Sequence, residues 1–379
     1  MIQYNTIKNM KILVFFTYGY SIKTWSDSGV LAREFEIYKV IANKFNVKFT
    51  FVTFGNNSDI KLNIDNELFE VIPIYTLIKY NKNPLLRYIK SFFIPFKLKH
   101  TIRENDILHQ HQLLGSWIPI ISKLIFNKPL LVRTGYDMYE FALKENKNKF
   151  IKILYKILTN LSLKYSNLFT VTSTSDLKRL NPKFRIKKRS NWVYNLTIED
   201  FDNRFKNRLL CVGRLVDQKN YEYLLNEFKN TKDWLVIDIY GSGENKEELV
   251  KKAKLLKVNI NIFENINNIE LLKVYNRYKF YVSTSKFEGN PKSLLEAMAS
   301  GCVCFASNIS NHTEIINNNH NGYIFDLSSN SLRSLFEIIF KKQNNLKNIS
   351  MNANKEITTS NSIDLIANYM YEDYLEIIK

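Results

Sequence analysis

Short apolar runs alternate with amphipathic helical patterns along the whole chain, and this alternation limits the fold more than any other feature. In the first half, apolar runs at residues 11–16 and 47–54 enclose a helical pattern at 30–44. The same order returns in the second half, with apolar runs at 209–212 and 234–240. A chain that repeats strand, helix and strand in this way builds parallel sheets covered by helices. We therefore expect an α/β protein.

The chain has 379 residues, which is too long for one ordinary domain and suits two. A polar joint at 203–207 separates the two alternating arrays, and we place the boundary within residues 197–208. The expected domains span residues 1–200 and 201–360. The aromatic, amphipathic tail at 361–379 predicts a closing helix that packs back towards the N-terminal domain.

The net charge is +18, from 54 basic and 36 acidic residues. Such a charge favours phosphates, nucleic acid or an anionic membrane as partners. Lys, Asn and Ile are abundant throughout, however, so the charge alone is a weak signal. A nucleic-acid binder driven by charge is one alternative, but the sequence contains no recognised nucleic-acid-binding motif, and we expect no nucleic acid as a partner.

No apolar run reaches the roughly 20 residues that a membrane span needs, and the N-terminus does not have the pattern of a signal peptide. We therefore expect the protein in the cytoplasm, or at the inner face of the cytoplasmic membrane. Cys211, Cys302 and Cys304 have neither a disulfide framework nor metal-ligand spacing. We expect no metal site, and Cys302 and Cys304 to be core thiols.

The stretch KFEGNPKSLLEAMASG, at residues 286–301, carries two glutamates eight positions apart, Glu288 and Glu296. Pro291 suits the first position of a helix, so Glu288 would lie in the preceding loop and Glu296 in the second turn. The loop follows an apolar run at 280–283, and open α/β sheets bind ligands at this end of their strands. Two solvated glutamates on a surface helix are the alternative, and we favour ligand binding.

A second candidate site follows the apolar run at 209–212. Gly213 and Arg214 come directly after it, and Lys219 lies just before a helical pattern at 221–228. Two cations and the free amides of a helix start suit a diphosphate. Two unrelated surface cations are the alternative.

Polar residues of the first half also follow apolar runs. Gly29 is either part of a phosphate site or a glycine that opens a helix. His109 and His111 would share one face of a strand; they are either structural or in contact with a sugar hydroxyl, since a third zinc ligand is missing. Arg133 is either a phosphate contact or half of a salt bridge.

Two segments combine many cations with exposed positions. Residues 85–100 alternate large apolar residues with cations, and Pro95 interrupts any helix there. This segment suits the interface of an anionic bilayer or a core helix with a cationic outer face. Residues 178–189 are densely basic, and form either a solvated surface loop or a contact to membrane or acceptor phosphates.

Three runs of the second half resemble the family 4 glycosyltransferases, which are retaining enzymes of the GT-B fold. The runs are VGRLVDQKNYEYLL at 212–225, YGSGENKEEL at 240–249, and FEGNPKSLLEAMASG through HTEIINNNHNGYIFDL at 287–327. The E-x7-E element is a recognised feature of that family. The first half is similar more loosely, through DILHQH, KPLLVRTGYD and SNWVYN. The resemblance implies two Rossmann-like domains whose parallel sheets face each other across a cleft.

The resemblance also implies a function. The protein would move a sugar from a UDP- or GDP-linked donor to a lipid-linked glycan in the biosynthesis of lipopolysaccharide, capsule or exopolysaccharide. A GT-B nucleotide-sugar epimerase and an inactive nucleotide-sugar-binding relative are the alternatives. The family needs no metal, because protein cations neutralise the leaving diphosphate.

Residue roles follow from the same resemblance. Arg214 and Lys219 would hold the diphosphate and act in catalysis together with Glu288, which would touch the donor sugar. Glu296 would bind the ribose. The remaining donor-binding candidates are Gly213, Gly289, Asn290, Lys292, Ser293 and Gly29.

The sequence departs from the family pattern at three places. The loop that begins at Arg133 lacks the histidine that often contacts the donor sugar, Pro291 replaces a usual glycine, and Gly29 stands where two glycines are usual.

Overall fold

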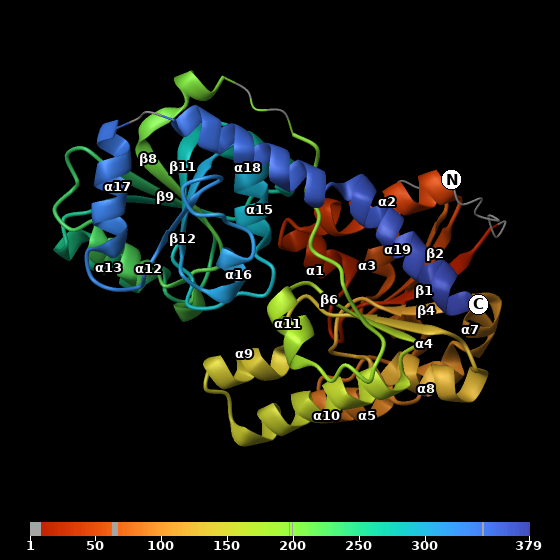
Figure 1. Ribbon diagram of the computed structural model, residues 1–379. Coiled ribbons are helices and arrows are strands. Elements are labelled where there is room, and N and C mark those ends of the chain that lie inside the picture. Colours follow the sequence, from red (N-terminus) through yellow and green to blue (C-terminus); the bar gives the residue numbers. More distant parts are fainter. Residues whose placement is uncertain (1–8, 63–66, 197, 199, 343–344) are drawn as a thin grey trace. The chain divides into compact units, whose positions relative to one another are not determined.

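The computed structural model describes residues 9–62, 67–196, 198, 200–342 and 345–379 (Figure 1). The chain forms two compact units, of which unit 1 comprises Met1–Ser190 with Asp364–Lys379 and unit 2 comprises Asn191–Ile363. The units thus meet in the sequence at residue 190, ten positions before the boundary drawn from the sequence. Each unit has one parallel sheet covered by helices. The predicted α/β class with two parallel sheets is confirmed.

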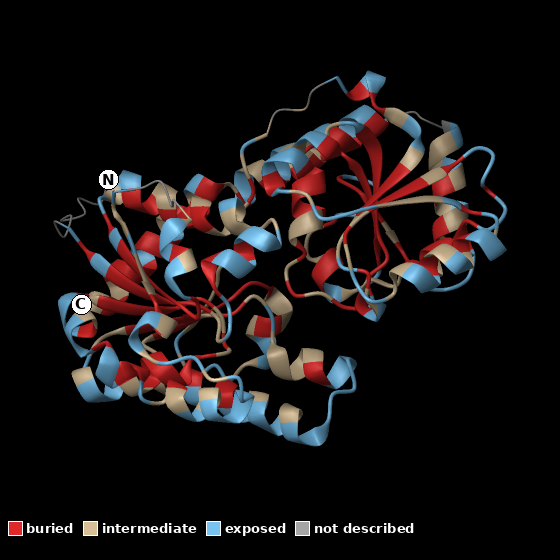
Figure 2. Ribbon diagram, turned by 180° about the vertical axis from the view of Figure 1, so that it is seen from behind, coloured by how far each residue is buried: buried red, intermediate tan, exposed pale blue. Residues whose placement is uncertain are grey.

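The sheet of unit 1 has seven strands in the order β3-β2-β1-β4-β5-β6-β7. Their bounds are β1 Lys11–Phe15, β2 Lys48–Thr53, β3 Phe69–Pro73, β4 Ile107–Gln110, β5 Leu130–Arg133, β6 Leu168–Val171 and β7 Ile186–Lys188. In β1, Leu13 and Phe15 belong to a core cluster on one face, and Ile12 and Val14 alternate with them. All four are buried, and the strands of this sheet are largely buried along their length (Figure 2). Strands buried on both faces are read from sequence as unbroken apolar runs, which is why these strands could be predicted.

Helices cover both faces of this sheet (Figure 1). Their bounds are α1 Ile22–Asp27, α2 Leu31–Phe45, α3 Asn57–Lys61, α4 Ile74–Leu77, α5 Pro84–Ser91, α6 Ile94–Lys97, α7 Lys99–Glu104, α8 Trp117–Phe126, α9 Met138–Lys144, α10 Lys149–Tyr165, α11 Thr174–Arg179 and α19 Ile363–Ile378. On one face, Tyr38 of α2 and Tyr374 of α19 pack near the ring of Phe49. On the other, Leu98, Ile118 and Leu158 lie in the cluster that contains Leu13 and Phe15.

Helix α1 lies in a polar stretch where the sequence shows no helical pattern, and a capping box of Ser21 and Thr24 starts it. The predicted interruption at Pro95 agrees with the structure. Helix α5 ends at Ser91, and Pro95 lies in the first turn of the next helix, α6, where a missing N–H costs nothing.

The C-terminal helix α19 packs in unit 1, where its acids pair with basic residues of the 178–189 segment. Asp373 accepts hydrogen bonds from Arg189 at 2.7 Å and from Lys187 at 3.0 Å, and Glu376 pairs with Arg185. The segment is therefore partly neutralised by the chain itself, although residues 181–183 are exposed. Its contact to membrane or acceptor phosphates stays a prediction.

The sheet of unit 2 has six strands in the order β10-β9-β8-β11-β12-β13. Their bounds are β8 Phe205–Val212, β9 Val236–Tyr240, β10 Asn259–Phe263, β11 Tyr278–Ser283, β12 Val303–Ser307 and β13 Tyr323–Phe325. Its helices are η1 Phe201–Asn203, η2 Asp217–Lys219, α12 Tyr221–Glu227, α13 Lys246–Leu255, α14 Asn268–Tyr275, α15 Lys292–Ala299, α16 Ser310–Thr313, α17 Ser331–Lys342 and α18 Leu346–Ser360. Cys211, Cys302 and Cys304 are buried free thiols, as expected for core positions.

The strand order of unit 2 reverses between β8 and β11, since the chain first adds strands on one side of β8 and then on the other. In doubly wound sheets a crevice for ligands forms at this switch point, at the carboxyl ends of the strands. The loops that leave β8 and β11 are therefore the first place to look for a site.

Candidate functional site

The loop after β8 places Lys219 against the end of its own strand. Gly213 has φ +153°, and a Cβ at this position would lie 2.9 Å from Cε of Lys219. A side chain there would push the lysine away, so glycine is needed for the close approach. Arg214, the next residue, is exposed.

The loop after β11 brings Glu288 onto Lys219. The Nζ atom of Lys219 lies 2.6 Å from Oε1 of Glu288, and the two side chains are 15% and 9% exposed. Ser285 donates a hydrogen bond of 2.7 Å to the same carboxylate oxygen. The sequence prediction that these residues converge therefore agrees with the geometry.

Gln218 joins Arg214 to this pair, although it was not among the residues predicted for the site. Its buried side chain accepts from Arg214 at 3.2 Å and donates to the carbonyl of Phe287 at 2.9 Å and to Glu288 at 3.4 Å. One amide thus orients a cation and a carboxylate at the same time. The available signal was the position of Gln218 between Arg214 and Lys219, the two predicted cations of one short loop.

Glu288 remains ionised in spite of its burial. Burial raises its pKa, but the charge and hydrogen bond of Lys219 and the hydroxyl of Ser285 outweigh this, so that the pKa lies below its ordinary value. A charged carboxylate and a charged ammonium therefore face each other in a partly dry site, where electrostatic interactions are stronger than in water.

His312, which was not predicted from the sequence, belongs to a chain of hydrogen bonds that leads through Ser307 to Ser285, the residue that donates to Glu288. His312 is fully buried, and its Nδ1–H donates to the carbonyl of Ser307 at 2.9 Å. Ser307 in turn donates to the carbonyl of Ser285 at 2.6 Å. Burial lowers the pKa of His312 to about 4, although Glu288 opposes the shift, so the imidazole is neutral near pH 7.

Glu296 belongs to a separate polar group on the inner side of α15. It is buried, and it accepts from Asn268 at 3.0 Å and from Tyr275 at 3.3 Å, both on α14. The two glutamates of the E-x7-E element therefore have different surroundings, one on the loop with Lys219 and one held by α14. A surface helix with two solvated glutamates is excluded.

The start of α15 holds the remaining donor-binding candidates of unit 2. Gly289 accepts from Asn311, Asn290 accepts from the amide of Asn191 at 2.7 Å, and Ser293 accepts from Tyr281 at 3.0 Å. Lys292 is half-buried and begins the helix. Pro291 is the N-cap, not the first helical residue as predicted, which shifts the helix start by one position.

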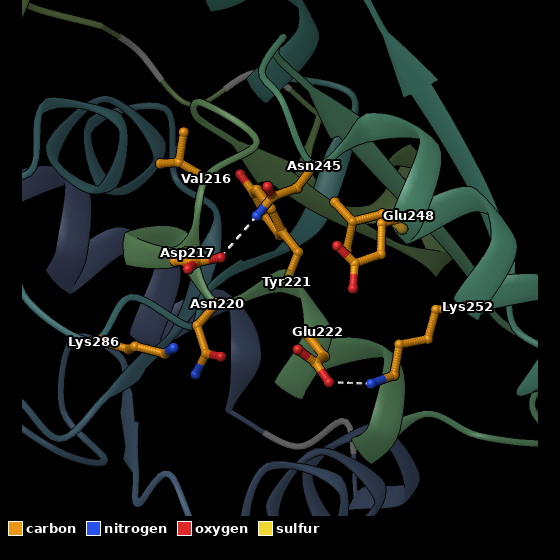
Figure 3. Close-up of a pocket in the computed structure, with 10 residues that line it drawn as sticks. Val216, Asp217, Asn220, Tyr221, Glu222, Asn245, Glu248, Lys252 and Lys286 are labelled. Carbon is orange, nitrogen blue, oxygen red and sulfur yellow. Dashed lines mark hydrogen bonds and ion pairs between the residues drawn. The ribbon is translucent and has the colours of Figure 1, made fainter. Parts of the chain in front are cut away.

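A polar cavity lies beside this cluster and shares η2 with it (Figure 3). Asp217 and Asn220, at either end of η2, line the cavity, while Gln218 and Lys219 between them contact Glu288. Across the cavity, Asn245 donates to Asp217 at 2.9 Å and Lys252 pairs with Glu222. None of the residues predicted for the site lines it.

The candidates of unit 1 have other surroundings. His109 is completely buried, its Nδ1 lies 2.7 Å from the hydroxyl of Tyr374, and burial holds its pKa well below the ordinary value. Nδ1 of His111 lies 2.9 Å from the hydroxyl of Tyr38. Of the two alternatives left by the sequence, both histidines therefore have the structural role. The other alternative, a contact with a sugar hydroxyl, is corrected.

Two further candidates of unit 1 remain. The charge of Arg133 acts on His109, Tyr38 and Tyr374, which places it beside the same buried group. Gly29 has φ +73° and lies between Ser28, the C-cap of α1, and Val30, the N-cap of α2. A left-handed glycine directly after a C-cap is typical of a helix end, so Gly29 separates two helices.

Within the described part of the chain, no group of three or more His, Cys, Asp or Glu side chains could hold a metal ion. No helix among the same residues combines the length and apolar character that crossing a bilayer requires.

Residues 199–356 match the family described as glycosyl transferases group 1. Unit 2 is a group 1 glycosyltransferase domain. The fold of the whole chain is similar to that of the Anabaena protein Alr3699/HepE, solved in complex with UDP and glucose, with a TM-score of 0.74 over 97% of this chain and 100% of that one, at 14% identity. The predicted GT-B fold and glycosyltransferase family are confirmed, whereas retention of configuration at the sugar stays a prediction.

Two named relatives each match more than half of the chain. One is a Campylobacter jejuni N-acetylgalactosaminyltransferase that acts on a diphospho-undecaprenol-linked sugar, 27% identical over 59% of this chain and 64% of its own length. The other is the Staphylococcus aureus capsular polysaccharide biosynthesis glycosyltransferase CapH, 26% identical over 60% of this chain and 67% of its own length. The matches thus span about two thirds of each relative.

Proposed function

We propose that the protein is a retaining glycosyltransferase that moves a sugar from a UDP- or GDP-linked donor to a lipid-linked glycan in surface polysaccharide synthesis. The observation that carries the proposal is the contact of Lys219 with Glu288, joined to Arg214 through Gln218, at the switch point of unit 2. The names of the relatives support the acceptor class, since one acts on an undecaprenol-linked sugar and the other makes capsule.

In this proposal the cations receive the diphosphate of the donor. Arg214 is exposed and hydrogen-bonded to Gln218, and Lys219 is held in place by Glu288, so the diphosphate meets two positive charges whose positions are fixed by neighbouring side chains. Both stabilise the charge that develops on the leaving group, which is the task that a divalent metal has in other transferases. Glu288 then orients hydroxyls of the donor sugar, and Glu296 those of the ribose.

The reaction needs no separate protein base. The bond between the anomeric carbon and the diphosphate oxygen breaks, and a bond from the acceptor oxygen forms on the same face of the sugar. The acceptor's proton moves to the departing phosphate oxygen. The site suits this step because it places the cations Arg214 and Lys219 beside the carboxylate of Glu288.

The alternatives predict different products. An epimerase would convert the nucleotide-sugar without any acceptor, and an inactive relative would bind the donor without consuming it. Product analysis with a radiolabelled donor and a lipid-linked acceptor separates the three, and the anomeric configuration of the product tests retention. We place the reaction at the cytoplasmic face of the membrane, where nucleotide-sugars and lipid-linked acceptors meet.

The site assignment is tested with Lys219→Ala and Glu288→Ala. Each removes a charge from the cluster, and loss of one group that stabilises developing charge costs about 100-fold or more in turnover. Transfer of labelled sugar to a lipid-linked acceptor is measured for each variant, with donors chosen from a panel of UDP- and GDP-sugars scored by thermal shift.

Lys286→Ala is the matched control, because it removes an exposed lysine two residues before Glu288. We expect this variant to keep wild-type turnover. Unfolding temperatures of all three variants report whether the fold survives. Wild-type turnover in both site variants would refute the assignment.

A further inference from the structure

Large apolar side chains of unit 1 are exposed on the helices that cover one face of its sheet. Among the described residues, twelve of them lie on or next to α5, α6, α8 and α10: Leu85, Leu86, Ile89, Phe93, Phe96, Leu124, Ile125, Phe150, Ile153, Leu154, Ile157 and Leu161. We call these residues, with Lys90, Lys97, Lys149, Lys152, Lys156 and Lys164, the α5–α10 face. Figure 2 shows these helices with a largely exposed outer side.

Helix α10 carries an apolar stripe on its outer side. Phe150, Leu154, Ile157 and Leu161 recur every three or four residues, which puts them on one side of a helix. Phe150 is 84% exposed. The inner side is held separately, since Ser162 hydrogen-bonds to Ser116 at 2.8 Å. One side of α10 therefore packs inside unit 1, whereas the apolar side that carries Phe150 is exposed.

The segment containing α5 and α6 repeats this arrangement. Leu85, Ile89 and Phe93 are exposed, whereas Ser91 faces inward and accepts a hydrogen bond of 2.9 Å from the indole of Trp117 on α8. Because α8 contacts α5 through Trp117 and α10 through Ser116, the three helices form one layer (Figure 1).

The charge of this layer has one sign. Helix α10 has four lysines and no acidic residue, and residues 84–103 contain five lysines and arginines and no acidic residue. In contrast, cations of the 178–189 segment are paired with Asp373 and Glu376. The lysines of the α5–α10 face thus remain available to an external anion.

We propose that the α5–α10 face binds the surface of an anionic lipid bilayer. Its apolar side chains would enter the boundary between headgroups and acyl chains, and its lysines would contact lipid phosphates. A second copy of the chain is a poorer partner, because pairing two such faces would oppose lysines without any acid to neutralise them. The proposal goes beyond the transfer reaction, since lipid binding is measured without donor or acceptor.

The experiment is co-sedimentation of the full chain with vesicles of phosphatidylcholine, with or without about a third of phosphatidylglycerol. Phe150→Ser/Ile157→Ser removes part of the apolar stripe, and Lys149→Glu/Lys152→Glu reverses two charges in the first turn of α10, where acids favour the helix. We expect the wild type to bind the anionic vesicles and not the neutral ones. Each double variant should bind at least about tenfold less.

Two control variants carry changes of the same kind on unit 2, one apolar and one charged. Leu255→Ser alters a side chain that is 82% exposed on α13, and Lys251→Glu/Lys273→Glu makes the same change in net charge at exposed positions. We expect both to bind within about twofold of the wild type. The proposal is overturned if the wild type stays in the supernatant, if the variants of the α5–α10 face bind like the wild type, or if the controls lose as much binding as those variants. Concentration-dependent dimers that disappear in Phe150→Ser/Ile157→Ser, without vesicle binding, would also overturn it.

Discussion

At the scale of single residues, the site combines a carboxylate that stays charged with a histidine that stays neutral. Lys219 keeps the pKa of Glu288 below its ordinary value, and burial lowers that of His312. Nδ1–H of His312 donates to the carbonyl of Ser307, and only the neutral ring leaves Nε2 free to accept from the hydroxyl of Ser283 at 3.3 Å. The protonation of this histidine should therefore affect the stability of unit 2.

We predict that acidification destabilises the protein through His312. Its pKa falls from 6.5 in the unfolded chain to about 4 in the folded one, so the unfolded state takes up the proton first. The stabilisation is complete above pH 6.5 and is lost as the pH falls towards 4. The difference is on the order of 3 kcal/mol, and His312→Gln should abolish this part of the pH dependence in urea denaturation.

His320→Gln serves as the control, since His320 is about half exposed, at 49%. It should leave the slope of unfolding free energy against pH unchanged. A His312→Gln variant with the same slope as the wild type between pH 6.5 and 4 would show that the buried ring does not carry the effect.

The sequence identified the charged residues of the site but not their supports. Lys219 and Glu288 belong to motifs that directly follow strands, so their meeting could be inferred from the rule that ligands bind at strand ends. Gln218, Ser285 and His312 act through contacts that depend on the exact course of the loops. His109 and His111 failed as sugar contacts because a strand pattern shows which face a residue takes but not what packs on it.

At the scale of elements, helix α19 completes a core that begins more than 300 residues earlier in the sequence. Its Tyr374 hydrogen-bonds to His109 of β4, and its Tyr371 stacks on Phe45 of α2 with ring centroids 3.9 Å apart. Asp373, which is only 1% exposed, forms ion pairs with Arg189 and Lys187. The helix is therefore held by apolar, polar and ionic contacts together.

We predict that Tyr374→Phe destabilises the protein by about 1–3 kcal/mol, because His109 would lose its buried hydrogen-bond partner. Tyr369→Phe is the control on the same helix, since the ring that Arg189 covers at 5.0 Å is kept. Its effect should stay within about 0.5 kcal/mol. Chemical denaturation measures both, and equal values would contradict a structural role for the Tyr374 hydroxyl.

Elements with strong periodicity were predictable, and elements set by local capping were not. The expected helices at 30–44 and 361–379 agree with α2 and α19 within two residues at each end, because their apolar spacing is regular. Helix α1 escaped prediction because the Ser21–Thr24 capping box sits in a polar stretch. Strand β8 begins four residues before its apolar run, at positions that are partly exposed.

At the scale of the molecule, both units use the same strand order. In each sheet the first strand lies between the second and the fourth, so each has a switch point where a ligand crevice can form. The switch point of unit 2 carries the cluster of Lys219, Glu288 and Gln218. In unit 1, by contrast, the histidines at the end of β4 hydrogen-bond to Tyr374 and Tyr38 of the same unit. We therefore assign the donor to unit 2.

We predict that UDP or GDP slows amide hydrogen exchange in unit 2 alone. The affected amides should lie at residues 213–219 and 285–293, which form the loops after β8 and β11, because a ligand that binds the folded state suppresses local opening. Lys219→Ala should remove the protection at equal nucleotide concentration. Protection that appears in unit 1 and not in these loops would contradict the assignment of the donor to unit 2.

Unit 2 is continuous in sequence, but unit 1 is not, since it is built from Met1–Ser190 and Asp364–Lys379. During translation, unit 2 can fold as soon as its own residues leave the ribosome, whereas unit 1 must wait until α19 has been made. Until then, the buried hydroxyl and carboxylate that Tyr374 and Asp373 bring to it are absent. The unit whose synthesis begins first is thus completed last, and a frameshift within α19 would damage a unit that is built mostly from the first 190 residues.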